Sequence, residues 1–290
     1  MKSTQFANRR GSDGPLEHVD LHMHSTFSDG ALPIRELIDF CHVQGLSAIA
    51  VTDHDNIDSF EEGKDHAREK GLEFVTGVEI SSSSGNSDIH ILGYLFDHTN
   101  LQLNRTLVGL RERRKQRAME IVNRLGELGV EVSYERILTR AHGGSVGRAH
   151  IAAQLVEEEF VGSFQEAFHK YLGNESDMMA DLETVRLTPA EAIHLILEAG
   201  GVPVLAHPSK TNRDDLLEGM VESGLMGIET YCHGQTAAVF EKYKAFARKY
   251  GLICSGGADF HARRQDGRNA PGSLKVPYKV LDMLKEAKPA

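Results

Sequence analysis

The stretch from residue 18 to residue 54 reads HVDLHMHSTFSDGALPIRELIDFCHVQGLSAIAVTDH, and its pattern changes twice. A short extended segment comes first, and Pro33 then opens a segment with apolar residues at helical spacing that ends at Gly45. The continuous apolar run at residues 48–51 is typical of a strand buried on both faces. The stretch therefore predicts a strand, a helix and a second strand, the repeating unit of a parallel sheet or barrel.

The same alternation continues on both sides of a helical interruption. Further strands are predicted at residues 74–79, 89–94, 202–206, 227–230 and 252–255, and further helices at about 59–70 and from a capping box that begins at Thr188. Between them, the patterns at residues 105–128, 147–159 and 163–172 are helical. About seven strands favour an α/β fold with a closed or distorted barrel. We expect a lead-in at 1–17, a host domain at 18–103 and 182–290, and a helical insert at 104–181.

Composition excludes several classes of protein. The chain has 290 residues and no apolar run near the roughly 20 residues of a membrane span, and its N-terminus lacks the apolar core of a signal peptide. Three widely spaced cysteines favour a reducing compartment, so we expect a cytoplasmic protein. A formal charge of −10 argues against non-specific coating of nucleic acid. No obligate protein partner is indicated.

Histidine and carboxylate side chains recur where predicted strands end. The candidate set has nine members, nearly all of them at or just after the end of a predicted strand: His22, His24, Asp29, His54, Glu79, His90, His207, Asp259 and His261. In parallel α/β folds and barrels the carboxyl ends of the strands meet at one rim, where sites are built. Imidazoles and carboxylates together suit Zn, Mn or Fe, and this set is large enough for three ions if Glu79 bridges two of them. The alternative is a purely structural polar cluster.

The order of these motifs resembles that of a known family. Asp20-Leu21-His22-Met23-His24-Ser25, Thr52-Asp53-His54, Gly77-Val78-Glu79, Ile89-His90-Ile91, Ala206-His207-Pro208 and Asp259-Phe260-His261 are similar to the successive motifs of the PHP (polymerase and histidinol phosphatase) superfamily. The resemblance spans about residues 18–265. It implies a distorted (β/α)7 barrel and a trinuclear metal site for phosphoester hydrolysis.

The resemblance also implies three ligand sets. The first ion is expected on His22, His24, Glu79 and Asp259, the second on Glu79, His90 and His207, and the third on Asp29, His54 and His261. Some relatives have His where this chain has Asp29, and a carboxylate there favours Mn²⁺ or Fe²⁺ over Zn²⁺. A water that bridges two ions, held by Glu79, His22, His24 and Asp259, is the expected nucleophile. Asp53 and His233 are weaker candidates for an acid or an orienting group.

Motifs in the insert resemble the helical cap of one branch of the superfamily, which includes 3′,5′-nucleotide bisphosphate phosphatases and 5′–3′ oligoribonuclease-type enzymes. They are Gly147-Arg148-Ala149-His150 and Phe168-His169-Lys170-Tyr171-Leu172. The resemblance implies that Arg148, His150 and Lys170 reach a second phosphate, and a guanidinium matches phosphate geometry. The alternative is that Arg148 merely begins a helix and Lys170 lies on a solvated face.

A basic run, Arg111 to Arg117, precedes these motifs. It either guides an RNA strand or forms the solvated face of a helix, and no stacking aromatic residue is interleaved with it.

Together with the resemblance, the sequence predicts an enzyme that removes the 3′-phosphate from a nucleoside 3′,5′-bisphosphate such as pAp, giving AMP. The alternatives are a 5′–3′ exoribonuclease on short RNA and, in another class, a non-catalytic metal-binding or polymerase-associated module.

Overall fold

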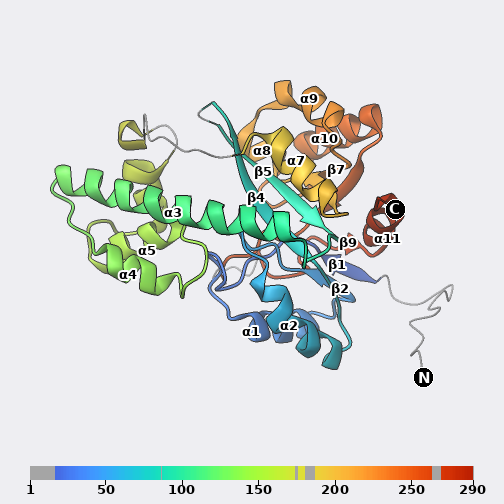
Figure 1. Ribbon diagram of the computed structural model, residues 1–290, viewed down its shortest axis with the longest axis horizontal. Helices are drawn as coiled ribbons and strands as arrows, with labels where there is room; N and C mark the ends of the chain where they lie inside the picture. Colours follow the sequence, from blue (N-terminus) through green and yellow to red (C-terminus); the bar gives the residue numbers. More distant parts are fainter. Residues whose placement is uncertain (1–16, 86, 174–175, 180–186, 263–268, 290) are drawn as a thin grey trace.

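The computed structural model describes residues 17–85, 87–173, 176–179, 187–262 and 269–289 (Figure 1). Of the lead-in expected at residues 1–17, all but Glu17 lies outside these ranges. The strands form one sheet of four and one of five. Helices cover them on both sides in Figure 1, with α1 and α2 on one side and α7, α9 and α10 on the other.

The first sheet holds the predicted strand–helix–strand unit. Its strands in spatial order are β3 (Glu73–Val75), β2 (Ala48–Ala50), β1 (His18–Asp20) and β9 (Val276–Pro277). β1, β2 and β3 are parallel, and β9 pairs antiparallel with β1. Helix α1 (Ile34–Val43) connects β1 to β2, and Pro33 stands at its N-cap as the sequence predicts.

The second sheet departs from the mainly parallel arrangement that the alternation predicts. Its strands in spatial order are β4 (Gly77–Ser84), β5 (Ser87–Tyr94), β6 (Val202–Leu205), β7 (Gly227–Tyr231) and β8 (Ile253–Gly256). β6, β7 and β8 are parallel, whereas β5 is antiparallel to both of its neighbours. Only two residues separate β4 from β5, and so short a connection joins antiparallel strands.

The two sheets meet at single bridges rather than through continuous ladders. Met23, just after β1, pairs with Phe260, just after β8, and His54, after β2, pairs with Glu79 in β4. Met23, Phe260 and His54 lie beyond the carboxyl ends of parallel strands, whereas Glu79 lies within β4. Strand pairing in the described residues therefore gives an α/β fold of two joined sheets, and these strands do not form one closed barrel.

The remaining helices of the host surround the sheets. They are α2 (Asp58–Glu69), α7 (Pro189–Glu198), α8 (Pro208–Thr211), α9 (Leu217–Glu222), α10 (Ala237–Tyr250) and α11 (Lys279–Ala287), with a short turn at η3 (Asp214–Leu216). The predicted capping box of α7 is confirmed. The Thr188 hydroxyl accepts from the amide of Glu191 at 3.2 Å, and the Glu191 carboxylate accepts from the amide of Thr188 at 2.7 Å.

The middle of the chain is helical. It contains α3 (Leu101–Glu127), α4 (Tyr134–Arg140), α5 (Arg148–Glu157), α6 (Phe164–Ala167), the π-helical η1 (Phe168–Leu172) and η2 (Asp177–Met179). The sequence pattern did not predict α4. Helix α3 begins four residues before the predicted start at residue 105, because Asn100 caps it by accepting from the amide of Leu103.

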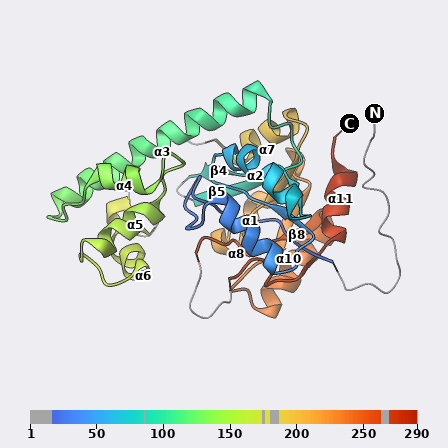
Figure 2. The same cartoon turned by 90° about the horizontal axis from the view of Figure 1, so that it is seen from below.

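Helix α3 belongs to two hydrophobic cores. Its first half packs Leu103 and Leu107 against β4, β5 and α7 in the core of the host. Its second half packs Ile121 and Leu125 against α4 and α5, in a separate core. Figure 2 shows α3 crossing from the sheets to the group formed by α4, α5 and α6. The helix thus fixes the position of the helical segment relative to the sheets.

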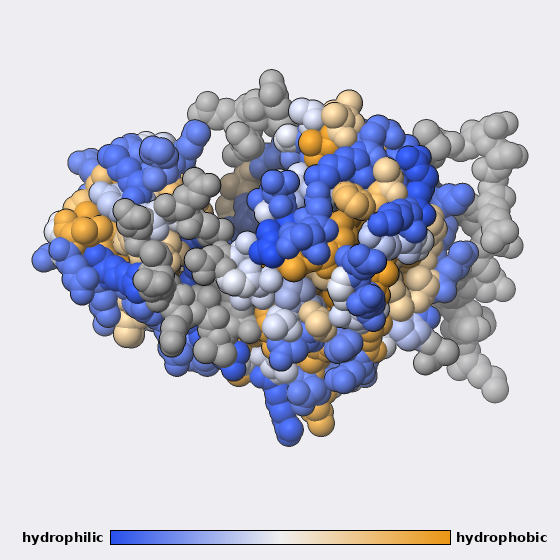
Figure 3. Space-filling model, turned by 90° about the horizontal axis from the view of Figure 1, so that it is seen from above, coloured by the Kyte–Doolittle hydropathy of each residue, from blue (hydrophilic) through white to orange (hydrophobic). Residues whose placement is uncertain are grey.

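The molecular surface is hydrophilic over most of the face seen in Figure 3, with isolated hydrophobic spots. The most exposed large apolar side chains are scattered over several helices, among them Val43, Leu101 and Phe164. Single exposed apolar residues are ordinary on protein surfaces. Within the described part of the chain, no helix combines the length and apolar character needed to cross a membrane.

Candidate metal centre

The two sheets bring the ends of β1 and β8 together at the base of the site. The amide of His24 donates to the carbonyl of Phe260, and the amide of Asp259 donates to the carbonyl of His22, both at 2.8 Å. His22 and His24 therefore point to the same side of an extended segment, as the alternation of strand side chains predicts. Gly257 allows this approach, because a Cβ there would lie 2.3 Å from the amide of His22.

Glu79 lies at the centre of the cluster and is almost completely buried. Its carboxylate is surrounded by imidazoles from five separate positions. Its Oε1 lies 2.8 Å from His90 Nδ1 and 2.9 Å from His207 Nε2, and its Oε2 lies 3.3 Å from His22 Nε2, 3.2 Å from His24 Nε2 and 3.2 Å from His54 Nδ1. Glu79 thus has the contacts that a bridging ligand needs.

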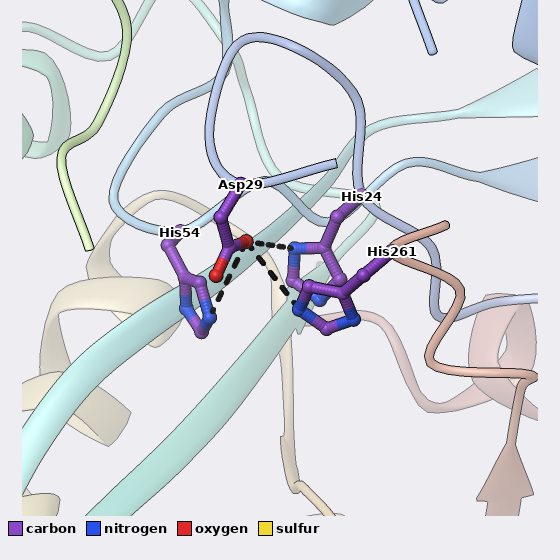
Figure 4. Close-up of side chains that lie close together, drawn as sticks. All are labelled: His24, Asp29, His54 and His261. Carbon is purple, nitrogen blue, oxygen red and sulfur yellow. Dashed lines mark ion pairs between the residues drawn. The ribbon is translucent and has the colours of Figure 1, made fainter. Parts of the chain in front are cut away.

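Asp29 forms the second focus of the site, with three imidazoles turned toward its carboxylate in Figure 4. Its Oδ1 lies 3.3 Å from His261 Nε2, 3.8 Å from His24 Nδ1 and 4.0 Å from His54 Nε2. Asp259 lies between the two foci, with its Oδ1 3.4 Å from His22 Nε2. All nine residues proposed as ligands from the sequence therefore come together.

The nine residues divide into four overlapping groups of possible ligands. The atoms within each group lie within 4.8 Å of one another: His24, Asp29, His54 and His261; His22, His24 and Asp259; His22, Glu79 and His207; and His54, Glu79 and His90. Glu79 belongs to two groups, as bridging requires. His24 adjoins the group at Asp29 as well as the group at Asp259, so the boundaries between the expected sets are less sharp than the sequence implies.

The donor atoms fit divalent cations. Within the described residues, His24 Nε2, His54 Nδ1 and Asp29 Oδ1 are buried and make no hydrogen bond of good geometry, although each has a charged neighbour at 3.2–3.3 Å. Buried polar atoms without partners are costly, and this mixed nitrogen and oxygen set is the one that borderline and hard divalent ions bind. The backbone is also strained here, because His207 and Asp259 adopt φ values of +27° and +49°. Such strain is concentrated at functional sites.

The charges of the cluster are strongly coupled. Burial alone would raise the pKa of Glu79, but the neighbouring imidazoles of His54 and His90 hold it well below its usual range. The pKa of Asp29 is likewise held low against burial, by His261 and His54. The carboxylates of Glu79 and Asp29 are therefore ionised near pH 7, which is the form that binds metal ions. The histidines divide, because burial lowers the pKa of His54 well below its usual value, whereas hydrogen bonds with Asp259 and Glu79 raise the pKa of His24 to about 10 against the effect of burial.

Glu229 supports the cluster and was missed by the sequence analysis. It lies in β7 and is 1% exposed. Its Oε1 accepts from His22 Nδ1 at 3.0 Å, and its Oε2 accepts from the amide of His207 at 2.7 Å. A carboxylate behind a ligating histidine fixes the ring and leaves the other nitrogen for the metal. The only signal in the sequence is a charged residue inside an otherwise apolar strand.

Asp53 is a structural residue rather than an acid exposed to substrate. Its side chain is fully buried and accepts from the amide and hydroxyl of Ser25 and from the hydroxyl of Ser28, at 2.7–2.8 Å. It thereby shapes the loop that carries Asp29. His233 lies in another loop and hydrogen-bonds with the hydroxyl of Ser273 at 2.9 Å.

A cavity of about 510 Å³ opens directly beside the ligand cluster. Asp29, His54 and His90 line one side of it, and residues of α3 and α5, with Phe168, line the other. Arg114 joins the two sides, because its Nε donates to Asp55 Oδ2 at 2.6 Å and its Nη1 donates to the carbonyl of Val146 at 3.3 Å. The helical segment therefore faces the ligands across a shared space.

The three residues expected to reach a second phosphate are placed differently. Arg148 lines the cavity, where its Nη2 donates to Asp88 Oδ2 at 3.0 Å. His150 is 6% exposed, and its Nδ1 accepts from the amide of Gly147. Lys170 lies outside this cavity and pairs with Glu166 at 2.5 Å. Only Arg148 of the three is therefore on the cavity wall.

Comparison with known proteins agrees with this geometry. The model of the PHP domain family matches residues 20–176. A 5′–3′ exoribonuclease of Haemophilus influenzae is 35% identical over 83% of this chain and 89% of its own length. A 3′,5′-nucleoside bisphosphate phosphatase of Chromobacterium violaceum is 31% identical over 90% of this chain and 93% of its own.

Solved structures agree as well. A candidate metal-dependent phosphoesterase of Bifidobacterium adolescentis superposes with a TM-score of 0.85 at 25% identity, over 96% of this chain and 99% of that one. A structure described as an amidohydrolase of Chromobacterium violaceum, with bound sulfate and no metal, gives a TM-score of 0.82 at 28% identity, over 94% and 98%. The chain belongs to the PHP family and is a metal-dependent phosphoester hydrolase.

Proposed function

We propose that this enzyme removes the 3′-phosphate from nucleoside 3′,5′-bisphosphates, converting pAp to AMP. The observation that carries the proposal is the cavity in which ligand residues face Arg148. A substrate with two phosphates needs a metal-binding wall for the reacting one and a cation for the other. The similarity to the bisphosphate phosphatase of Chromobacterium violaceum over most of both chains supports this choice.

Three divalent ions are proposed, on the sets expected from the resemblance: His22, His24, Glu79 and Asp259; Glu79, His90 and His207; and Asp29, His54 and His261. The geometric groups overlap with these sets without reproducing them, because His90 groups with His54 and Glu79, whereas His207 groups with His22 and Glu79. Mn²⁺ is the proposed ion, with Fe²⁺ or Zn²⁺ as alternatives, because the carboxylate of Asp29 favours a harder cation. When bound, such ions acidify a water for attack on phosphorus and neutralise charge on the phosphoryl oxygens.

The chain's own residues then orient the substrate. Arg148 presents a planar guanidinium that matches a phosphate, although it must share its donors with Asp88. Arg114 is held by Asp55 and lends positive charge to the cavity wall near His54. The walls formed by α3 and α5 limit the access of water to the ligand side.

The domain assignment is part of the same proposal. The separate hydrophobic core of α4, α5 and the second half of α3 supports a helical cap at residues 104–181 on a host of 18–103 and 182–290. The bridges Met23–Phe260 and His54–Glu79 support a distorted barrel formed by the two sheets together. The free thiols of Cys41, Cys232 and Cys254 support a cytoplasmic location.

The test compares two substrates on Mn²⁺-loaded protein. We expect fast conversion of pAp to AMP and inorganic phosphate, with an Asp259→Ala variant as the inactive control. A short 5′-phosphorylated RNA serves as the second substrate. Stepwise release of mononucleotides from the RNA, with pAp untouched, would replace the proposal by the exoribonuclease, which the similarity to the Haemophilus influenzae enzyme favours. Inertness to both with metal bound would point to another phosphoester as the substrate, or to the non-catalytic module.

A further inference from the structure

The loop that carries Asp29 is held by the helical segment as well as by the host. The carbonyl of Phe27, in this loop at residues 25–30, accepts from the amide of Ser145 at 2.9 Å. The two backbones are in direct contact, because a Cβ at Gly144 would lie 2.3 Å from the Phe27 carbonyl oxygen. The connection between α4 and α5 therefore fixes one side of this loop, which we call the Asp29 loop.

His150 provides a second contact with the Asp29 loop. The residue is almost completely buried, and its Nδ1 accepts from the amide of Gly147 at 3.0 Å. Burial lowers the pKa of His150, whereas the charge of Asp29 and a hydrogen bond with the backbone of Ser28 oppose that shift. In a neutral ring whose Nδ1 accepts, Nε2 carries the proton. The Ser28 amide already donates to the carbonyl of Ser25, so the carbonyl of Ser28 is the group that accepts from His150.

This arrangement leaves the His150 ring no group for a substrate. Both of its nitrogens have backbone partners, and a buried polar group with its partners in place is satisfied. Arg148, two residues earlier on the same helix, lines the cavity beside the ligands, whereas His150 does not. The two charged members of one short motif therefore face different surroundings.

Asp29 depends on such contacts more than the ligands that lie within strands. Glu79 and His90 are held by the pairing of β4 with β5, whereas Asp29 lies in a turn. The helical segment also comes close to Asp29 itself, because a Cβ at Gly147 would lie 3.6 Å from Asp29 Oδ2. A ligand on a turn keeps its position only when the surrounding groups hold that turn.

We propose that His150 is a positioning residue for Asp29. It holds the Asp29 loop against α5, so the ion proposed at Asp29, His54 and His261 depends on contact between the helical segment and the host. His150 does not bind the second phosphate, in contrast to the role that the resemblance of its motif implies. The inference rests on the proposed function, because this ion is one of the three proposed there.

The experiment compares metal binding with hydrolysis in one set of variants. His150→Leu removes both ring nitrogens, and His150→Gln keeps an amide donor where Nε2 stands. His169→Leu is the matched control, because it is the same substitution at an exposed histidine of η1. Asp29→Ala is the reference for loss of the ion, and it is also combined with His150→Leu.

Calorimetric titration with Mn²⁺ gives the number and affinity of the bound ions. Hydrolysis of pAp and of p-nitrophenyl phosphate is measured at limiting and at excess Mn²⁺. Circular dichroism of the metal-free proteins checks the fold. Should His150→Leu fail to fold, His150→Asn takes its place, because its shorter amide keeps an acceptor near Nδ1 but does not extend to the Ser28 carbonyl.

We expect His150→Leu to weaken the binding of one ion about 10- to 100-fold and to leave the other ions unchanged. At limiting Mn²⁺, kcat/KM should fall by the same factor on both substrates, about tenfold or more, and excess Mn²⁺ should restore it. The double variant should bind as much Mn²⁺ as Asp29→Ala alone, because both changes remove the same ion. His150→Gln should lose less than about threefold, and His169→Leu less than about twofold.

Three results would overturn the role of His150. The first is a loss on pAp alone with Mn²⁺ binding unchanged, which would make His150 a phosphate ligand. The second is an equal weakening of all ions, or a double variant that binds less Mn²⁺ than Asp29→Ala. The third is Asp29→Ala that binds Mn²⁺ as the wild type does. The proposed phosphatase would survive each of them if the wild type converts pAp to AMP. Conversely, selective loss of the ion in a protein inert to pAp would support the role of His150 and reject that substrate.

Discussion

The two walls of the cavity are built in opposite ways. The ligand wall consists of short side chains that leave the ends of strands, where backbone bonds such as His24 to Phe260 fix their positions. The helical wall consists of long arginine side chains whose positions depend on ion pairs, such as Arg148 with Asp88 and Arg114 with Asp55. One wall is preorganised by the main chain, and the other is adjustable.

This difference assigns different tasks to the two walls. Chemistry needs groups held to within a fraction of an ångström, which backbone pairing supplies. Selection among substrates tolerates groups that exchange one partner for another. We therefore expect changes in the ligand wall to affect every substrate, and changes in the helical wall to affect some substrates more than others.

The largest effect is expected from His22→Ala or Asp259→Ala. Each variant removes a ligand that contacts the cluster at 3.3–3.4 Å, so hydrolysis of every phosphoester should fall more than about a thousandfold. The fold should persist, because neither side chain is part of a hydrophobic core. Steady-state rates, bound-metal content and circular dichroism test this. Unchanged activity with reduced metal content would contradict the assignment.

Metal removal is expected to have the next largest effect, and it acts through the ligand wall alone. Chelation should abolish hydrolysis, and Mn²⁺ at a hundred times its Kd should raise the free energy of unfolding by about 2.7 kcal/mol for each independent site. Thermal melts in Mn²⁺ and in chelator give the difference. Asp29→Ala should retain part of the shift, because it belongs to only one ligand group. Identical melts with and without metal would argue against an ion at these residues.

Glu229→Gln should have an intermediate effect. It weakens the hold on His22 and on the amide of His207 without removing a ligand, so metal affinity should fall about 10- to 100-fold. A metal titration followed by activity and by calorimetry measures the loss. Excess metal should restore most of the rate, whereas it should not rescue Asp259→Ala.

Arg148→Ala tests the helical wall, because it should affect two substrates to different extents. Loss of a charged hydrogen bond to the second phosphate should cost about tenfold in kcat/KM on pAp. The simple monoester p-nitrophenyl phosphate lacks that phosphate and should be much less affected. Equal losses on both substrates would mean that Arg148 supports the fold through Asp88 and Phe168 rather than selecting the substrate.

The smallest effect is expected from Lys170→Ala. Lys170 pairs with Glu166 on the surface and lies outside the cavity beside the ligands, and exposed ion pairs contribute little. We expect less than a twofold change in kcat/KM on pAp. A tenfold fall would show that Lys170 reaches the substrate, as the resemblance of its motif to the PHP cap implies.

Several ligands could be predicted from the sequence because they follow a buried apolar segment. His54 after residues 48–51 and His207 after residues 202–206 are examples. Strand ends converge in any parallel α/β arrangement, so convergence did not require knowledge of the pairing. Glu229 escaped notice because it lies within a strand, where nothing local distinguishes a supporting carboxylate from an exposed one.

The helical wall was harder to predict for two physical reasons. Side-chain positions on it depend on long-range ion pairs, such as Arg148 with Asp88, which no local pattern encodes. The segment with Lys170 is also π-helical, and a π-helix does not keep the spacing of an α-helix. The antiparallel pairing of β5 with β6 likewise joins segments that are far apart in the chain.

The spread of the ligand residues along the chain has a consequence for biosynthesis. His22 is synthesised before Asp259 and His261, which lie more than 200 residues further along the chain. Asp20 accepts hydrogen bonds from the amides of Ala258 and Gly272. The base of the site therefore cannot form before this later segment has been synthesised. Long-range closures of this kind slow folding. The complete set of proposed ligands therefore comes together only after the segment that carries Asp259 and His261 has been synthesised and has paired with the segment after β1.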